Sequence, residues 1–354
     1  MTVPSPHPPE LHAEPGDLLG THRVISPPGA LPQPAERLDN DLRCLYGSEI
    51  LVDVLTLNVD AASFRQMEEE RGSAGVAEAV LSTVKARGKQ HNPVTGSGGM
   101  LLGVVVAVGR DAAHRGVQPG DRLATLASLS LTPLSLVEVT AVRRESAQLD
   151  VTGRAVIFGS APFAKLPPDF PERVAVALFD VAGAAPQVAR LVKEGDQVVV
   201  LGGGGKSGLL CVAEARRRVG AGGRVVAVEN HPRYAEDLRV LGLCDAVLAA
   251  DATNPIEVRD VVLPHLTGEA NAVFSCVNVP GAELAAIVLT RPRGFVYFFA
   301  MTTSFPRAAL GAEGMGKDID LYIGNGFAEG HAAHTLDLVR SSPDLRTLLE
   351  TRYG

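Results

Sequence analysis

A glycine-rich segment near the middle of the chain has the spacing of a dinucleotide-binding turn. Gly203, Gly205 and Gly208 follow a valine-rich run at 198–201 and precede an amphipathic segment at 209–219. In such turns one glycine makes the bend, one lets backbone N–H groups approach a diphosphate, and one lets helix and strand touch. The positive end of the helix then faces the phosphates. The segment predicts a dinucleotide site, with a purely structural turn as the alternative.

An acidic residue follows the next valine-rich run. Glu229 directly follows the run 224–228. In dinucleotide-binding folds a carboxylate at this position hydrogen-bonds the adenosine ribose and repels a 2′-phosphate, so NAD is favoured as the cofactor. His231 and Arg233 could accept a phosphate, so NADP stays open. The predicted cofactor-binding residues lie in the turn and after the strands: Gly202, Gly203, Gly204, Gly205, Lys206, Ser207, Gly208, Glu229, Asn230, Asp251, Asn278 and Thr302.

A parallel sheet is needed to position these groups. Short apolar runs alternate with helical patterns or loops in the second half of the chain and predict six strands. They lie near residues 198–201, 225–228, 246–249, 272–276, 295–299 and 319–323. Six strands joined by crossovers form an α/β fold with a doubly wound six-stranded parallel (Rossmann) sheet. The predicted roles of Asp251, Asn278 and Thr302 depend on this strand order.

The first half of the chain has a different pattern. Turns separate short apolar runs, which predicts a β-rich domain, and residues 63–87 have a helical pattern with a charged face. The apolar runs cover residues 50–57, 100–109, 122–126 and 154–158. We expect a loose N-terminal arm at 1–19, a β-rich domain at 20–182, a dinucleotide-binding domain at 183–325, and a helical segment at 326–354 that returns onto the β-rich domain.

The composition argues against several partners and locations. With a formal net charge of -7 and an isoelectric point near 5.7, the chain would not be attracted to nucleic acid or to an anionic membrane surface. No apolar stretch is long enough to cross a bilayer and no signal peptide is visible, so the predicted location is the cytoplasm. The four cysteines form no CxxC pair and are interpreted as reduced.

Several segments resemble the medium-chain dehydrogenase/reductase superfamily. Residues 116–124 (GVQPGDRLA) are similar to the turn before the strand that closes its chaperonin-10-like (GroES-like) catalytic domain. Residues 193–201 (KEGDQVVVL) are similar to the entry to its first nucleotide strand, and residues 202–208 to the glycine loop of its zinc-independent quinone-reductase branch. The resemblance implies a GroES-like catalytic domain and an active site in the cleft between the domains.

A narrower resemblance is to the L-erythro-3,5-diaminohexanoate dehydrogenase family. It is carried by residues 20–25 (GTHRVI), 31–35 (LPQPA), 91–100 (HNPVTGSGGM), 128–134 (SLSLTPL), 309–314 (ALGAEG) and 323–326 (IGNG). That family oxidatively deaminates its substrate to 5-amino-3-oxohexanoate and ammonia with NAD or NADP, in lysine fermentation. The resemblance implies a small diamino acid substrate, and the superfamily implies a homodimer or larger homo-oligomer formed through the edge of the nucleotide sheet.

The resemblance also indicates where the catalytic residues lie. Zinc dehydrogenases of the superfamily have a cysteine near position 60 and a Gly-His-Glu motif near 96–99, whereas this chain has Asp60 and a Gly-Ser-Gly-Gly run. A tetrahedral catalytic zinc is therefore not expected. Asp60 would receive a substrate ammonium or take its proton, and Ser63 beside it is a further catalytic candidate. The alternative is that Asp60 and Ser63 cap a helix.

The remaining catalytic candidates are assigned in the same way. His91 could carry a proton because its ordinary pKa lies near neutrality, or it could be a plain loop residue. Thr95 and Ser97 could orient substrate or water, or could only form a tight turn. Asp180 lies where the superfamily lines its cleft and would suit a second ammonium, with capping as its alternative.

The sequence does not single out a ligand for the substrate carboxylate, and it leaves two alternative functions open. The substrate carboxylate needs a cation, and Arg23, Lys89 and Lys317 are the options, with none preferred. A zinc-free quinone or enone reductase of the same fold is an alternative enzyme. A catalytically idle nucleotide-binding protein is the alternative from another class.

Overall fold

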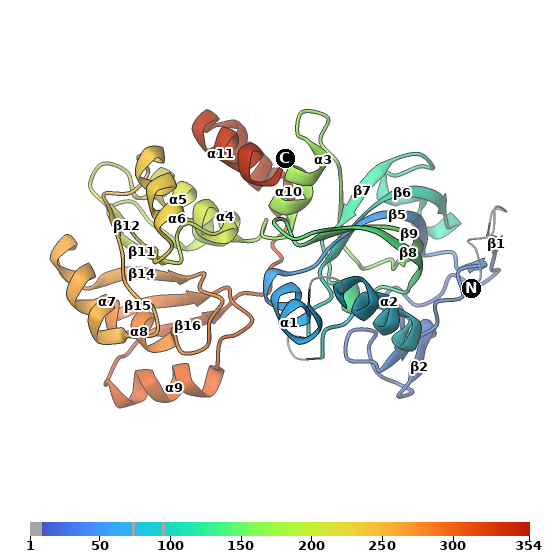
Figure 1. Ribbon diagram of the computed structural model, residues 1–354, viewed down its shortest axis with the longest axis horizontal. Coiled ribbons are helices and arrows are strands. Elements are labelled where there is room, and N and C mark those ends of the chain that lie inside the picture. Colours follow the sequence, from blue (N-terminus) through green and yellow to red (C-terminus); the bar gives the residue numbers. More distant parts are fainter. Residues whose placement is uncertain (1–8, 73–74, 94–95) are drawn as a thin grey trace. The chain divides into compact units, whose positions relative to one another are not determined.

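The computed structural model describes residues 9–72, 75–93 and 96–354, which fall into two compact units (Figure 1). The first unit comprises the chain up to Asp180 together with Tyr353–Gly354, and the second comprises Val181–Arg352. The domain boundaries expected after residues 19, 182 and 325 stay predictions, because compactness differs from the ability to fold independently.

A six-stranded antiparallel sheet forms the centre of the first unit. Its strands lie in the order β10-β7-β6-β5-β9-β8. They are β5 (Ile50–Asn58), β6 (Met100–Val108), β7 (Arg122–Thr125), β8 (Leu134–Arg143), β9 (Gln148–Ile157) and β10 (Phe163–Lys165). Two short pairs complete the strands of this unit: β1 (Glu10–Leu11) with β4 (Cys44–Leu45), and β2 (Val24–Ser26) with β3 (Arg37–Leu38).

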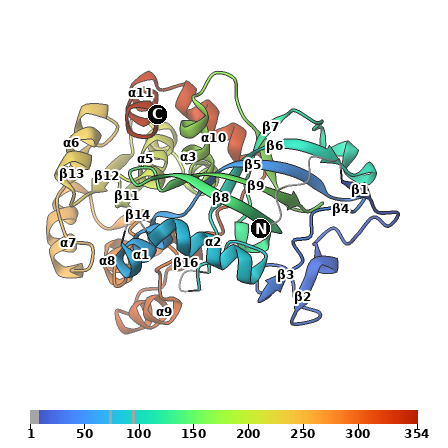
Figure 2. The same ribbon diagram turned by 45° about the vertical axis from the view of Figure 1, so that its right-hand side comes forward.

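Three helices lie among the described residues of the first unit up to Asp180. They are α1 (Ala61–Arg71), α2 (Gly75–Arg87) and α3 (Glu172–Phe179), with short 3-10 turns at Thr21–Arg23, Arg110–Arg115 and Leu129–Leu131. α1 and α2 pack against each other, and α2 lies against β8 (Figure 2). One helical pattern predicted over 63–87 is thus two helices, which meet near Gly72, where φ is 71°.

The start of β5, a central strand of the first sheet, is apolar and buried, which explains why this strand could be predicted. Ile50, Leu51 and Val52 of β5 are 0% exposed, and β5 pairs with β6 on one side and β9 on the other. The β-rich first half is therefore confirmed. β8 was not predicted, because it is an edge strand whose Glu138 and Thr140 are exposed and interrupt the apolar pattern.

A six-stranded parallel sheet forms the centre of the second unit. The strand order is β13-β12-β11-β14-β15-β16. The strands are β11 (Gln197–Leu201), β12 (Arg224–Val228), β13 (Ala246–Leu248), β14 (Ala270–Ser275), β15 (Thr290–Phe298) and β16 (Asp320–Ile323). All five pairings are parallel, so the predicted doubly wound sheet is confirmed. Residues 198–201 of β11 are 0% exposed, as expected for a parallel strand covered on both faces.

Helices cover both faces of the parallel sheet (Figure 1). α5 packs against β11 and β12, whereas α8 packs against β14 and β15, and α10 packs against α4 and α5. The helices are α4 (Ala184–Leu191), α5 (Lys206–Val219), α6 (Pro232–Leu241), α7 (Pro255–Val262), α8 (Glu283–Leu289), α9 (Phe305–Gly314), α10 (His331–Arg340) and α11 (Pro343–Tyr353), with a 3-10 turn at Leu263–His265. Within the described ranges, no single helix is long and apolar enough to span a bilayer.

Candidate active site

The glycine turn joins β11 to α5 in the second unit, as the sequence predicts. β11 ends at Leu201, and α5 begins at Lys206 with Gly205 as its N-cap. Gly202 has a φ of 71°, a left-handed conformation that favours glycine. A Cβ added at Gly208 would lie 2.1 Å from the carbonyl oxygen of Gly202, so the helix can begin this close to the turn only with glycine there.

Three N–H groups of the turn tie it to the end of β12. The N–H groups of Gly202 and Gly203 donate to the carbonyl oxygen of Val228 at 2.9 and 3.2 Å. The N–H of Gly204 donates to Oε2 of Glu229 at 3.0 Å. The shape of the turn is therefore set by the neighbouring strand.

The first turn of α5 supplies the donors suited to a phosphate. An α-helix cannot satisfy its first N–H groups, and its dipole is positive at that end. Lys206 and Ser207 are half-buried at this position, as expected for a phosphate loop. The close approach at Gly208 brings these N–H groups directly against the turn. This arrangement fits the diphosphate of a dinucleotide.

Glu229 lies directly after β12, where the ribose of a dinucleotide would be recognised. Glu229 is 7% exposed, and its Oε1 accepts a hydrogen bond from the N–H of His231 at 2.9 Å. Its Oε2 accepts from Gly204, so each oxygen uses one hydrogen bond and keeps further acceptor capacity. The predicted neighbour Asn230 is exposed.

The other predicted cofactor residues follow the carboxyl ends of parallel strands in the same sheet. Asp251, after β13, is exposed and accepts from both the N–H and the hydroxyl of Thr253, which lowers the pKa of its carboxyl group. Asn278, after β14, is exposed. Thr302, after β15, has a buried Oγ1 with no hydrogen-bond partner among the described residues. Thr302 is thus the one of these three with an unused polar atom inside the fold.

Asp60 caps α1 and also has an unused carboxylate oxygen. Its Oδ1 accepts from the N–H of Ser63 at 2.9 Å, and Ser63 itself is 1% exposed. Helix capping therefore accounts for one carboxylate oxygen of Asp60, Oδ1. Oδ2 of Asp60 is buried and has no hydrogen-bond partner in the part of the chain that the structure describes. A buried acceptor of this kind is costly unless something else pairs with it.

The loop before β6 is tightly folded around Ser97. The carbonyl oxygen of Ser97 accepts from the N–H of Asn92 at 2.8 Å, and its Oγ accepts from the N–H of Gly99 at 3.3 Å. The tight-turn alternative thus accounts for these contacts of Ser97. Thr95 lies outside the described residues. A Cβ on Gly99 would lie 2.1 Å from the carbonyl oxygen of Asn58, so this loop approaches the end of β5 closely.

His91 is half-buried in the same loop. Burial, followed by the charges of Lys89 and Arg87, lowers the pKa of His91 below its ordinary value. This shift favours the uncharged form of the imidazole, which has one ring nitrogen that can accept a hydrogen bond. Its Nδ1 is buried and has no partner among residues 9–72, 75–93 and 96–354.

Five buried polar atoms without a partner gather in this part of the first unit, and we call their residues the polar cluster. It consists of Asn58, Asp60, Gln90, His91 and Gln148. Native structures leave few buried polar atoms unsatisfied, so each needs an explanation. A group of them beside a predicted catalytic carboxylate indicates a binding site for a polar small molecule.

Strand pairing brings the polar cluster together. Asn58 lies opposite Met100 on β6 and opposite Gln148 on β9, and Nε2 of Gln148 donates to Oδ1 of Asn58 at 3.1 Å. A Cβ on Gly98 would lie 2.3 Å from the carbonyl oxygen of Gln90. Sequence reasoning missed Asn58, Gln90 and Gln148. The available signal was a polar residue at the end of a strongly apolar run, which Asn58 provides.

Asp180 ends the first segment of the first unit, directly before the chain enters the second unit at Val181. It forms the C-cap of α3, and its N–H donates to the carbonyl oxygen of Val176 at 3.1 Å. The backbone of Asp180 therefore has the helix-capping role that the sequence offered as the alternative. A role for its side chain with Asp60 stays a prediction.

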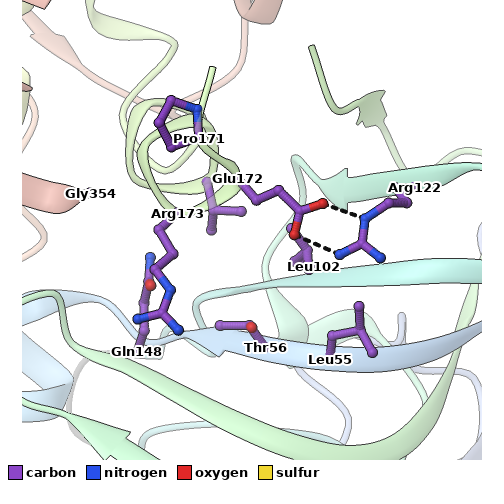
Figure 3. A pocket seen from close by; sticks show the side chains of 10 residues that line it. Leu55, Thr56, Leu102, Arg122, Gln148, Pro171, Glu172, Arg173 and Gly354 are labelled. Carbon is purple, nitrogen blue, oxygen red and sulfur yellow. Dashed lines mark hydrogen bonds and ion pairs between the residues drawn. The ribbon is translucent and has the colours of Figure 1, made fainter. Parts of the chain in front are cut away.

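A pocket of about 320 Å³ opens beside the polar cluster, and Gln148 belongs to both (Figure 3). Figure 3 shows Arg173 extending toward Gln148, while Arg122 donates to Oε2 of Glu172 at 2.6 Å. The pocket is lined by Leu55, Thr56, Leu102, Arg122, Gln148, Pro171, Glu172, Arg173, Val176 and Gly354. An arginine next to an amide suits a carboxylate.

The three cations considered for the substrate carboxylate are used inside their own units. Arg23 is 1% exposed and bonds both oxygens of Glu49. Lys89 is 0% exposed, donates to two backbone carbonyl oxygens at 2.8 Å, and has its pKa lowered by burial to about 8. Lys317 pairs with Glu269. Arg173, which sequence reasoning missed, lines the pocket and also pairs with Asp150 at 3.6 Å.

Metal ligands do not gather in the part of the chain that the structure describes. No group of three or more histidine, cysteine, aspartate or glutamate residues is placed to hold an ion there. The prediction that catalysis needs no zinc rests on the residue types at 60 and 96–99 and stays a prediction.

Known proteins are similar to this chain over nearly all of its length. Residues 22–167 match the model of the L-erythro-3,5-diaminohexanoate dehydrogenase N-terminal domain. Two proteins named L-erythro-3,5-diaminohexanoate dehydrogenase, from Acetoanaerobium sticklandii and Fusobacterium nucleatum, are 47% and 45% identical over 96% of this chain and 99% of their own.

A solved structure, the quinone oxidoreductase from Coxiella burnetii, covers 87% of this chain and 88% of its own with a TM-score of 0.55 and 17% identity. At that identity the likeness concerns the fold, which is of the medium-chain dehydrogenase/reductase type, with a Rossmann sheet and a GroES-like β-rich domain. The sequence identity to the two relatives shows the family to which the chain belongs. The chain is an oxidoreductase that belongs to the L-erythro-3,5-diaminohexanoate dehydrogenase family.

Proposed function

We propose that the chain oxidatively deaminates L-erythro-3,5-diaminohexanoate to 5-amino-3-oxohexanoate and ammonia, with a nicotinamide dinucleotide as the hydride acceptor and without zinc. The observation that carries the proposal is the identity, over nearly the whole chain, to two dehydrogenases named for that substrate. The glycine turn, the first turn of α5 and the polar cluster around Asp60 supply groups of the kind that this reaction needs.

The reaction asks three things of the protein. The carbon bearing the reacting amine must be held in place, the amine must lose its proton, and a water must attack the iminium that follows hydride removal. A bound nicotinamide dinucleotide supplies the hydride acceptor. The chain supplies orientation and proton handling.

Asp60 and His91 are the groups that handle protons in this proposal. Oδ2 of Asp60 is a buried acceptor that a substrate ammonium would satisfy, and it can take the proton that the amine must lose. The uncharged imidazole of His91 is a second acceptor. Ser97 and Thr95 orient the substrate or the attacking water, and Asp180 faces the second ammonium.

NAD is the preferred cofactor in this proposal because of Glu229, and this preference can be tested. We expect Glu229→Ala to raise the ratio of kcat/KM with NADP to that with NAD about tenfold, since a charge that repels a 2′-phosphate is lost. Steady-state kinetics with both cofactors measures the ratio. Glu229→Gln is the matched variant, because it removes the charge and keeps the shape. An unchanged ratio in both variants would show that Glu229 does not face the ribose.

Three measurements together separate the three candidate functions. Purified chain is mixed with NAD or NADP and L-erythro-3,5-diaminohexanoate, and reduced cofactor is followed by absorbance. Amine oxidation gives a signal, which a zinc chelator should leave unchanged. A quinone or enone reductase gives none here but consumes reduced cofactor with an enone. An idle binding protein binds NADH in a fluorescence titration and turns over neither compound.

We also infer a homodimer or larger homo-oligomer formed through β16, in the cytoplasm. β16 is one of the two edge strands of the parallel sheet, and its Ile323 is 66% exposed. Phe305 and Leu310 of α9 in the same unit are 60% and 67% exposed. An exposed apolar edge strand has unpaired backbone groups that can pair with another strand. In a two-fold symmetric dimer, the same strand of a second copy would pair with them.

The oligomer can be tested by light scattering after gel filtration. Wild-type chain should have at least twice the mass of one chain, and Ile323→Lys should shift the mass toward the monomer because a charge is placed at the paired edge. A monomeric wild type would contradict the inference.

A further inference from the structure

The last helix of the chain delivers an arginine to the glycine turn. Nη1 of Arg352, in α11, donates to the carbonyl oxygen of Gly204 at 2.7 Å. The same guanidinium pairs with Asp237 on α6, and its centre lies 4.3 Å from the ring centroid of Tyr234. The Arg352 side chain is only 5% exposed, although it lies next to the end of its helix. All of these residues belong to the second unit.

Arg352 and Glu229 hold Gly204 from opposite sides of its backbone. The N–H of Gly204 donates to Glu229, and its carbonyl oxygen accepts from Arg352. Two hydrogen bonds to charged groups fix how the peptide groups of Gly204 are turned, and such bonds are among the stronger ones in proteins. A Cβ on Gly204 would lie 2.5 Å from Cβ of Tyr234, so the backbone of the turn packs against α6 with no room for a side chain at Gly204.

The arginine keeps one donor unused at this position. Nε of Arg352 is buried and has no hydrogen-bond partner among the described residues. A buried positive charge with a spare donor costs free energy, and among the residues that the structure describes it pairs with one carboxylate, that of Asp237. Its position on the turn places that positive charge beside the candidate diphosphate site.

We propose that Arg352 is a positioning residue for the dinucleotide: it fixes the glycine turn in the shape that receives the diphosphate, and its charge favours an anion there. The inference rests on the proposed function, in which a nicotinamide dinucleotide binds at this turn. It adds α11, an element outside the strand-turn-helix motif, to the cofactor site.

The test compares how strongly cofactor fragments bind to wild type and to Arg352→Gln. We expect NADH and ADP-ribose to bind about tenfold more weakly to the variant, since one charge-assisted hydrogen bond and one charge are lost near the diphosphate. Binding of reduced nicotinamide mononucleotide, which lacks the adenosine half and the diphosphate link, should be unchanged. Fluorescence titration measures NADH and the mononucleotide, and calorimetry measures ADP-ribose.

Two further variants keep the test informative if Arg352→Gln folds poorly. Arg352→Lys keeps the charge but not the planar fork, so it should recover part of the lost affinity. Asp237→Asn leaves the arginine in place and removes the negative charge that pairs with it, so it should weaken the binding of NADH by a smaller factor. Arg239→Gln is the matched control, because Arg239 lies on α6 and pairs with exposed Glu236 at 3.3 Å.

The outcomes separate this inference from the proposed function. A wild type that binds neither NADH nor NADPH contradicts the proposed function and removes the basis of the inference. A wild type that binds NADH, together with an Arg352→Gln variant of equal affinity, overturns the inference alone. An equal loss for ADP-ribose and for the mononucleotide, with a lower melting temperature, would assign Arg352 a merely structural role and also overturn it.

Discussion

Turnover of the Asp60→Asn variant is expected to be at least about a hundredfold lower than that of the wild type, because a positioned acid or base contributes a factor of this size. Asparagine is also a good N-cap, so α1 should keep its start and the fold should be preserved. NADH affinity should change far less than turnover, because the groups proposed to hold the diphosphate belong to the glycine turn and to the start of α5. Steady-state kinetics and a fluorescence titration measure the two quantities.

The same kinetics separate the two roles of Asp60. If its Oδ2 takes the amine proton, kcat falls at saturating substrate; if it only holds an ammonium, KM rises and kcat is kept. Glu69→Gln is the matched control, because it makes the same carboxylate-to-amide change on the exposed side of α1. Turnover equal to wild type in Asp60→Asn would remove Asp60 from the mechanism.

The Gly208→Ala variant is expected to lose most of its affinity for NADH. The added Cβ would lie 2.1 Å from the carbonyl oxygen of Gly202 and 2.7 Å from Cα of Gly203, so the turn or the start of α5 must move. Overpacking of this kind costs about 1–3 kcal/mol, which corresponds to roughly a ten- to hundredfold loss of affinity if it is borne by the bound state.

Gly222→Ala is the control for this second prediction. A Cβ on Gly222 meets nothing within 4 Å, and its backbone has no positive φ. Its NADH affinity and its melting temperature should stay close to those of wild type. Unaltered NADH binding in Gly208→Ala would mean that the dinucleotide does not bind against this turn.

The parallel sheet could be predicted because its strands are continuous apolar runs. Residues 198–201 and 225–228 are fully or almost fully buried, so the sequence has no polar interruption to obscure the strand. The glycine turn was predictable for the same local reason, since the glycines follow one of these runs directly. The start of β15 was placed five residues late, at 295 and not 290, because Arg291 and Arg293 are exposed before the buried part begins.

The polar cluster and the anchoring arginine could not be predicted in this way. Asn58 and Gln148 are 90 residues apart in sequence, and Arg352 is 148 residues from Gly204. Each contact depends on strand pairing or helix packing that no local pattern encodes. The capping and functional interpretations of Asp60 could not be separated by sequence either, because its two oxygens have different surroundings.

The distance in sequence between Gly204 and Arg352 also bears on how the chain is made. The ribosome adds residues from the amino end, so the strand, the turn and the start of α5 emerge well before α11 does. During that interval the carbonyl oxygen of Gly204 lacks the arginine that holds it in the finished protein. A nascent chain that has passed residue 208 therefore carries the sequence motif, but it acquires the completed turn only when translation reaches the last helix.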